Sequence, residues 1–171
     1  MRRWLLALTA IGAVSLGGSE AALGAPAPRV HLASLAELPT PLPYPYDVDA
    51  DAERALAAAL KHAMASHKKV LVDLGGNWCA DCRILASIMQ LPEVAAFVNA
   101  HYEVVAIDVG RYDRNMQIPA RYGLTKLAGV PSLLILDSHG KVLNAGHESA
   151  LTDARSMTPQ ALADWLARWT D

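Results

Sequence analysis

The two cysteines of the chain, Cys79 and Cys82, are separated by only two residues, and there is no third cysteine. They follow the apolar run 70–74 and precede a stretch with helical periodicity, so we expect them at the first turn of a helix. The free N–H groups and the positive dipole end of such a turn favour a thiolate over a thiol. A disulfide across so short a loop restrains little of the unfolded chain. The spacing therefore indicates a redox pair.

A metal site and a haem attachment site are the other common uses of closely spaced cysteines. Tetrahedral zinc needs four ligands, and no His–Cys cluster lies near the pair in the sequence. Covalent haem attachment needs a histidine directly after Cys82, where this chain has Arg83. We therefore expect no metal and no cofactor, because the dithiol is itself the redox centre.

Apolar patterning predicts one α/β domain over residues 48–171. The run 70–74 is apolar on both faces, as in a strand buried within a sheet. Asp49 or Asp51 is placed to cap a helix that ends near residue 67, and Thr158 is placed to start the last helix. The other expected elements are helices at 79–89, 93–99 and 118–122 and strands at 102–108, 132–137 and 141–145, the last two joined as a hairpin.

The first 47 residues have the composition of an export signal followed by an extended segment. Three features predict that residues 1–24 are a signal peptide: charged residues at 2–3, the apolar run 4–16, and a small-X-small cleavage site at 22–24. The alternative is an uncleaved anchor, although the run is shorter than the ~20 residues that span a bilayer. Residues 25–47 hold six of the ten prolines and form either an arm packed on the domain or a plain tether.

Charge and compartment limit the expected partners. The formal net charge is −2 and no basic stripe is present, so we expect no nucleic-acid partner. In an oxidising compartment, a dithiol stays reduced only if a partner reduces it. The export signal therefore predicts a periplasmic protein with an electron donor.

The stretch from Val70 to Cys82, with the sequence Gly-Val-Pro-Ser at 129–132 and the hairpin after it, resembles the thioredoxin family. A Trp-Cys-X-X-Cys motif after a buried strand is specific to that family, and a Val-Pro step about fifty residues later strengthens the match. The resemblance covers roughly residues 48–170 and is strongest to exported members. It implies a thioredoxin fold, in which helices flank a central mixed β-sheet.

The resemblance implies roles for three residues in dithiol–disulfide exchange. Cys79, at the exposed helix end, attacks a substrate disulfide, and the more deeply placed Cys82 resolves the mixed disulfide. Asp73 matches the buried acid of the family, which moves protons to and from the resolving cysteine. The alternative is a solvated residue at the strand end. The lysine that often accompanies this acid on the neighbouring strand is replaced by Val104.

Three further residues are expected to form the substrate-binding surface. Pro131 resembles the cis-proline of the family, which turns the backbone of Val130 outward so that substrate pairs with it as an added strand. A trans proline at the start of a strand is the alternative. Trp78 is expected to be a flat, partly exposed wall beside Cys79, with a core tryptophan as the alternative.

Ala80 and Asp81 lie between the cysteines, where side chains tune the redox potential. The negative charge of Asp81 disfavours a thiolate and so favours a more reducing couple, which opposes the helix dipole. Arg83 is a candidate to pair with Asp81 and cancel much of this effect.

The leading functional hypothesis is an exported thiol:disulfide oxidoreductase that acts mainly as a reductase. Its expected partners are disulfide-containing proteins and a membrane electron donor of the thiol:disulfide interchange type. One alternative is an oxidase or isomerase, which would donate disulfides to substrates or rearrange them. Another is a thioredoxin-fold peptide-binding or chaperone module without turnover.

Overall fold

A three-stranded mixed sheet forms the centre of the computed structural model, which describes residues 24–171. β1 (Lys69–Gly75) lies between β2 (Tyr102–Asp108), which runs parallel to it, and β3 (Ser132–Leu136), which runs antiparallel. All residues of β1 after Lys69 are buried, as its apolar sequence predicts for a strand with neighbours on both edges. The predicted fold class is confirmed.

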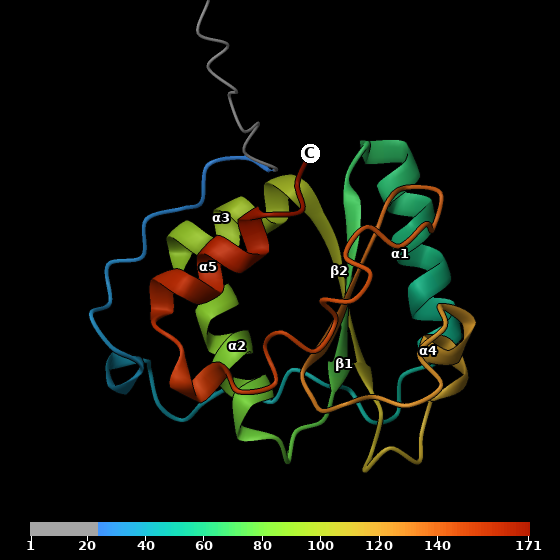
Figure 1. The fold of residues 1–171 in the computed structure, drawn as a ribbon, viewed down its shortest axis with the longest axis horizontal. Coiled ribbons are helices and arrows are strands. Elements are labelled where there is room, and N and C mark those ends of the chain that lie inside the picture. The colour runs from blue at the N-terminus through green and yellow to red at the C-terminus, as the bar shows by residue number, and fades with distance from the viewer. Residues whose placement is uncertain (1–23) are drawn as a thin grey trace, which may run out of the picture.

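Helices cover both faces of the sheet (Figure 1). α1 (Ala52–Ser66) and the short α4 (Gln117–Arg121) lie on one side. α2 (Ala80–Met89), α3 (Pro92–His101) and α5 (Pro159–Ala167) lie on the other, with short 3-10 turns at Leu35–Glu37 and Ala154–Ser156. The predicted helix starts are confirmed, because Asp51 accepts the Arg54 N–H at 3.0 Å and Thr158 accepts the Ala161 N–H at 3.1 Å.

The predicted strand at 141–145 is wrong. Only one isolated bridge, between Leu136 and Val142, forms beside β3. The buried side chain of Asn144 accounts for this difference, since its Oδ1 accepts the Ile135 N–H and its Nδ2 donates to the Leu133 carbonyl, both at 2.8 Å. A side-chain amide thereby satisfies backbone groups of β3 that a strand would otherwise pair.

The proline-rich segment, residues 25–47, packs against the domain as an arm. It runs beside the layer of α2, α3 and α5 (blue in Figure 1). Leu38 is buried in the same apolar cluster as residues of these helices, and Leu32, Leu35 and Leu42 pack partly against it. Near its start, the Ala25 N–H donates to Thr170 Oγ1 at 2.5 Å. These contacts favour a packed arm over a plain tether.

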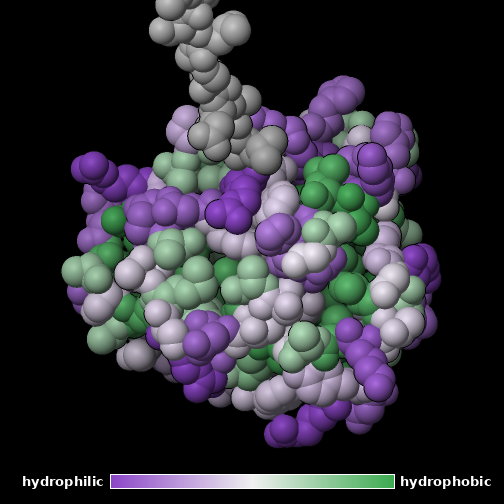
Figure 2. All heavy atoms as spheres, in the orientation of Figure 1, coloured by the Kyte–Doolittle hydropathy of each residue, from purple (hydrophilic) through white to green (hydrophobic). Residues whose placement is uncertain are grey.

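Hydrophilic and hydrophobic side chains are interspersed on the face drawn in Figure 2. Within residues 24–171, no helix combines the length and the apolar character needed to cross a membrane. The predicted signal peptide at 1–24 falls, except for Gly24, outside the described residues.

Candidate redox site

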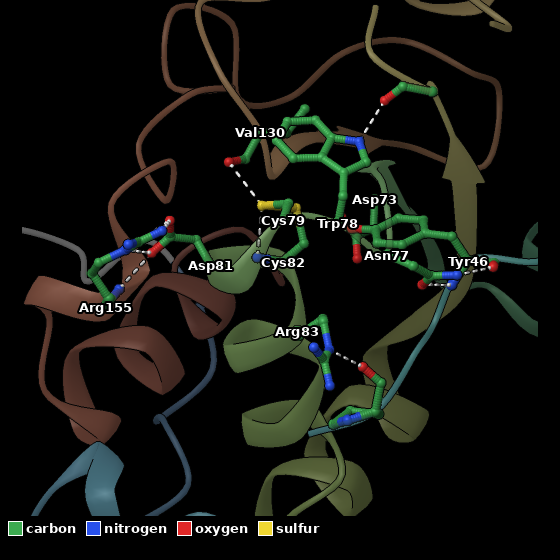
Figure 3. Close-up of a disulfide and its surroundings, with 12 residues drawn as sticks. Tyr46, Asp73, Asn77, Trp78, Cys79, Asp81, Cys82, Arg83, Val130 and Arg155 are labelled. Atoms are coloured by element: carbon green, nitrogen blue, oxygen red, sulfur yellow. Dashed lines mark hydrogen bonds and ion pairs between the residues drawn. A yellow bond between two sulfur atoms is a disulfide. The ribbon is translucent and has the colours of Figure 1, made fainter. Parts of the chain in front are cut away.

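The Cys79–Cys82 disulfide lies at the start of α2, with 5.3 Å between the two Cα atoms (Figure 3). Cys79 is the N-cap residue, and its Sγ accepts the backbone N–H of Cys82 at 3.1 Å. This N–H would also stabilise a Cys79 thiolate after reduction, together with the helix dipole. Cys79 keeps only 5% of its surface exposed, less than its role as the exposed cysteine predicts, whereas Cys82 is completely buried. The order of access is therefore as predicted.

Cys79 lines an open pocket of about 470 Å³. Trp78 forms part of its wall and is 44% exposed as a residue. The ring is held by an Nε1–H bond of 2.7 Å to the Gly110 carbonyl and by an edge contact with Tyr112. Trp78 is thus a partly exposed wall, as predicted, and not a core residue.

Val130 and Pro131 lie beside the disulfide, joined by a cis peptide bond. The carbonyl oxygen of Val130 lies 3.4 Å from Cys79 Sγ. Val130 also lines the pocket, although its side chain is buried. Two loops far apart in the sequence therefore bring a backbone carbonyl to the more accessible sulfur.

Asp73 is buried on β1, which excludes the solvated strand-end alternative. Its Oδ1 accepts a hydrogen bond of 2.8 Å from the Tyr46 hydroxyl. Burial raises the pKa of Asp73 to about 7, and the hydrogen bond from Tyr46 acts in the opposite direction. An acid with this pKa exchanges protons near neutral pH.

Sequence reasoning missed Tyr46 as a partner of this acid. Asp73 is in register with Ala106 on β2, and Val104, the residue in place of the family lysine, is exposed. The sequence indicated only that the tyrosines of the arm could pack on the domain, because exposing them to water is unfavourable. That argument does not identify the partner of Tyr46.

The predicted pairing of Arg83 with Asp81 is wrong. The buried Asp81 carboxylate instead binds Arg155, which donates its backbone N–H and its guanidinium at 2.5–3.0 Å. Residues two apart on a helix do not face each other, so Arg83 points away and donates to the carbonyls of Leu42 and Pro43. Burial alone would raise the pKa of Asp81, but the hydrogen bonds and charge of Arg155 hold it below its usual value.

We expect opposite shifts in redox potential when the two charges of this ion pair are removed singly. Arg155→Gln leaves a carboxylate beside the sulfurs, which disfavours the thiolate, so the potential should fall by roughly 10–30 mV. Asp81→Asn leaves a cation and should raise it by a similar amount. Equilibration with dithiothreitol measures both shifts. Arg121→Gln, which breaks a surface pair with Glu53, is the control; shifts of the same sign in both site variants would contradict this account.

Residues 24–171 contain no group of three or more His, Cys, Asp or Glu side chains arranged to hold a metal ion. At the site, the sulfurs of Cys79 and Cys82 can exchange electrons, and the Asp73 carboxyl can accept or donate a proton.

Comparison with known proteins identifies the family. Residues 51–138, just over half of the chain, match the family model described as thioredoxin-like. The chain belongs to the thioredoxin-like family. With its cysteine pair at disulfide distance, it is a thiol:disulfide oxidoreductase of thioredoxin fold.

A solved structure described as a disulphide isomerase from Xylella fastidiosa Temecula1 is 37% identical to this chain. The match covers 76% of this chain and 99% of that one, with a TM-score of 0.71. Thioredoxin from Alicyclobacillus acidocaldarius is 27% identical over 78 residues, which is 46% of this chain and 67% of that protein. Thioredoxin-2 from Pyricularia oryzae is 43% identical over 56 residues, and the match spans only 30% of either chain.

Proposed function

We propose that this protein is an exported, periplasmic reductase of protein disulfides. The observation that carries the proposal is the arrangement of the Cys79–Cys82 pair: one sulfur lines an open pocket and the other lies buried on the side of Asp73. A cleaved signal peptide at residues 1–24 is part of this proposal.

The proposed reaction transfers two electrons from the dithiol to a substrate disulfide. The Cys79 thiolate attacks one substrate sulfur, the substrate S–S bond breaks, and the other substrate sulfur leaves as a thiolate. Cys82 then loses its proton to the Asp73 carboxylate and attacks Cys79 Sγ, which releases the second substrate sulfur. The substrate leaves reduced, the protein is left oxidised, and a membrane donor of the thiol:disulfide interchange type restores the dithiol.

Substrate binding is proposed to use the pocket beside Cys79. An extended substrate segment would pair with the backbone of Val130 as an added strand and pack against the exposed ring of Trp78. Pro131 supports this placement, because it holds the Val130 carbonyl beside the sulfur.

Buried carboxylates near the pair support the direction of reduction. Asp73 lies on the face of β1 against which the Cys82 sulfur packs, and Asp108 is buried on β2 in register with Gly75. Negative charge near sulfur disfavours the thiolates and so makes the disulfide form relatively stable and the couple reducing. Arg114 offsets part of the charge of Asp108 through an ion pair of 3.0 Å.

An isomerase is the second candidate, and the Xylella structure described as a disulphide isomerase favours it. The reduction potential separates the candidates. A reductase is expected near the thioredoxin value of about −270 mV, whereas an isomerase or oxidase lies at about −180 mV or above.

Insulin-disulfide reduction with dithiothreitol as donor tests for turnover. We expect activity from the wild-type protein and at least a 1,000-fold loss in Cys79→Ser, because the hydroxyl does not replace the nucleophilic sulfur. Equal rates for the two proteins would exclude catalysis and leave only a peptide-binding or chaperone role.

A further inference from the structure

The arm contacts residues on both sides of the cysteine motif through residues 42–44 and Tyr46. Arg83, the residue after the motif, donates to the carbonyls of Leu42 and Pro43, and its guanidinium lies 4.0 Å from the centre of the Tyr44 ring. Asn77, two residues before Cys79, exchanges two hydrogen bonds with the backbone of Tyr46, of 3.1 Å and 2.7 Å. These bonds orient the segment that carries Tyr46 into the core.

The Tyr46 hydroxyl lies beside both the buried acid and the buried sulfur. Asp73 and Gly75 are two residues apart on β1 and so point to the same face of the sheet. A side-chain carbon placed on Gly75 would collide with the Tyr46 hydroxyl and would lie 2.8 Å from Cys82 Sγ. The Tyr46 hydroxyl, the Asp73 carboxyl and Cys82 therefore meet over Gly75, on one side of the disulfide in Figure 3.

The Tyr46 hydroxyl keeps its proton in this arrangement. Burial raises the pKa of its hydroxyl far above the usual range, and the charge of Asp73 adds to the effect. Its proton is therefore directed at Asp73 Oδ1, while Oδ2 has no hydrogen-bond partner among residues 24–171. One oxygen of the acid is occupied, and the other is available for a proton.

We propose that Tyr46 is a positioning residue for the resolving step, which holds Oδ1 of Asp73 so that Oδ2 accepts the proton of Cys82. The arm, residues 25–47, then completes the redox site and is required for proton transfer. This inference rests on the proposed dithiol chemistry of Cys79 and Cys82, but not on its direction.

The charged groups around Asp73 are few within the described residues. Its register neighbours, Ala106 and Leu133, are apolar. The other titratable groups on this face are Tyr46 from the arm, Cys82 from α2 and Asp108 from β2, whose charge is paired with Arg114. The hydrogen bond from Tyr46 therefore favours the ionised form of Asp73 without competition from a lysine or arginine at the acid.

Single-turnover oxidation of the reduced protein by dithiobis(nitrobenzoate) measures the resolving step separately from the first attack. Cys79 attacks first and releases one nitrothiobenzoate anion. In the second phase, the Cys82 proton passes to Asp73, the Cys82 sulfur bonds to Cys79, and the second nitrothiobenzoate leaves with the electron pair of the broken S–S bond. Absorbance follows both phases in full-length protein, and insulin is not used, so failure of the reductase proposal leaves this readout intact.

Tyr46→Phe keeps the buried ring and removes the donor. Because that donor lowers the pKa of Asp73, we expect the pH midpoint of the second phase to rise by about one unit from a value near 7. The second phase should slow roughly fivefold at pH 7, while the rates converge above about pH 9 and the first phase is unchanged. Tyr44→Phe, a change in the same arm at an exposed tyrosine, should behave as wild type.

A double-variant comparison shows whether Tyr46 acts through Asp73. In an Asp73→Asn background, Tyr46→Phe should have no further effect on the second phase. An unchanged midpoint in Tyr46→Phe, or an equal slowing in the Asp73→Asn background, would overturn the proposal. Infrared spectra provide a test that does not use Tyr46→Phe. The Asp73 carboxyl band, identified by its loss in Asp73→Asn, must have the frequency of a hydrogen-bonded acid. The frequency of a free acid would overturn the proposal.

Discussion

Cys82→Ser should leave substrate proteins covalently attached to Cys79. In this variant the first attack still forms a mixed disulfide, but no second thiol is present to release it, and no other cysteine exists in the chain. Because Cys82 is completely buried, replacing it does not remove the accessible nucleophile, which is Cys79. Affinity purification from cells that express the variant, followed by non-reducing electrophoresis and mass spectrometry, identifies the trapped partners.

The matched control is the double variant Cys79→Ser/Cys82→Ser, which should trap nothing. Wild-type protein should show adducts at a level at least tenfold lower than Cys82→Ser, because resolution removes them. Adducts that persist in the double variant would come from another route. If Cys79→Ser trapped as many partners as Cys82→Ser, the assignment of Cys79 as the nucleophile would be wrong.

Asp73→Asn should slow the resolving step about 100-fold at pH 7, because general acid–base catalysis by a positioned group contributes roughly this factor. The amide keeps the shape of the side chain and still accepts a hydrogen bond from Tyr46, but it binds no proton from Cys82. Turnover of insulin and the second phase of single-turnover oxidation both measure the loss. A rate equal to that of the wild type would show that another group takes the proton.

The same substitution should make the oxidised protein more stable at high pH. In the folded protein burial holds the pKa of Asp73 at about 7, against an ordinary value of 3.8. As pH rises between these values, the unfolded chain ionises while the folded protein keeps its proton, so the wild type loses up to about 4 kcal/mol of stability. Urea unfolding should therefore show Asp73→Asn to be more stable at pH 8 and similar to wild type near pH 4. A variant that is equally destabilised at both pH values would contradict a buried acid with a raised pKa.

The helices and strands that surround the site could be predicted from local patterns. β1 and β2 are apolar runs of strand length, and α1 and α5 begin at side-chain caps, Asp51 and Thr158, that are visible in the sequence. The region after β3 could not be predicted in this way. No pattern in the sequence shows that the side-chain amide of Asn144 bonds the backbone of β3 in place of a neighbouring strand.

The sequence by itself determined the redox pair of this protein, because local structure alone places two cysteines on one helix turn. The role of the acid six residues earlier came from the resemblance to the thioredoxin family. Only the tertiary structure decided how that chemistry is adjusted. Arg155, 74 residues from Asp81, neutralises the acid between the cysteines, and Tyr46, 27 residues from Asp73, donates to the buried acid. Arg155 lies in the short 3-10 turn Ala154–Ser156 and Tyr46 lies in the arm. In such connecting segments, loop paths and packing set which side chains meet, and no spacing rule encodes these contacts.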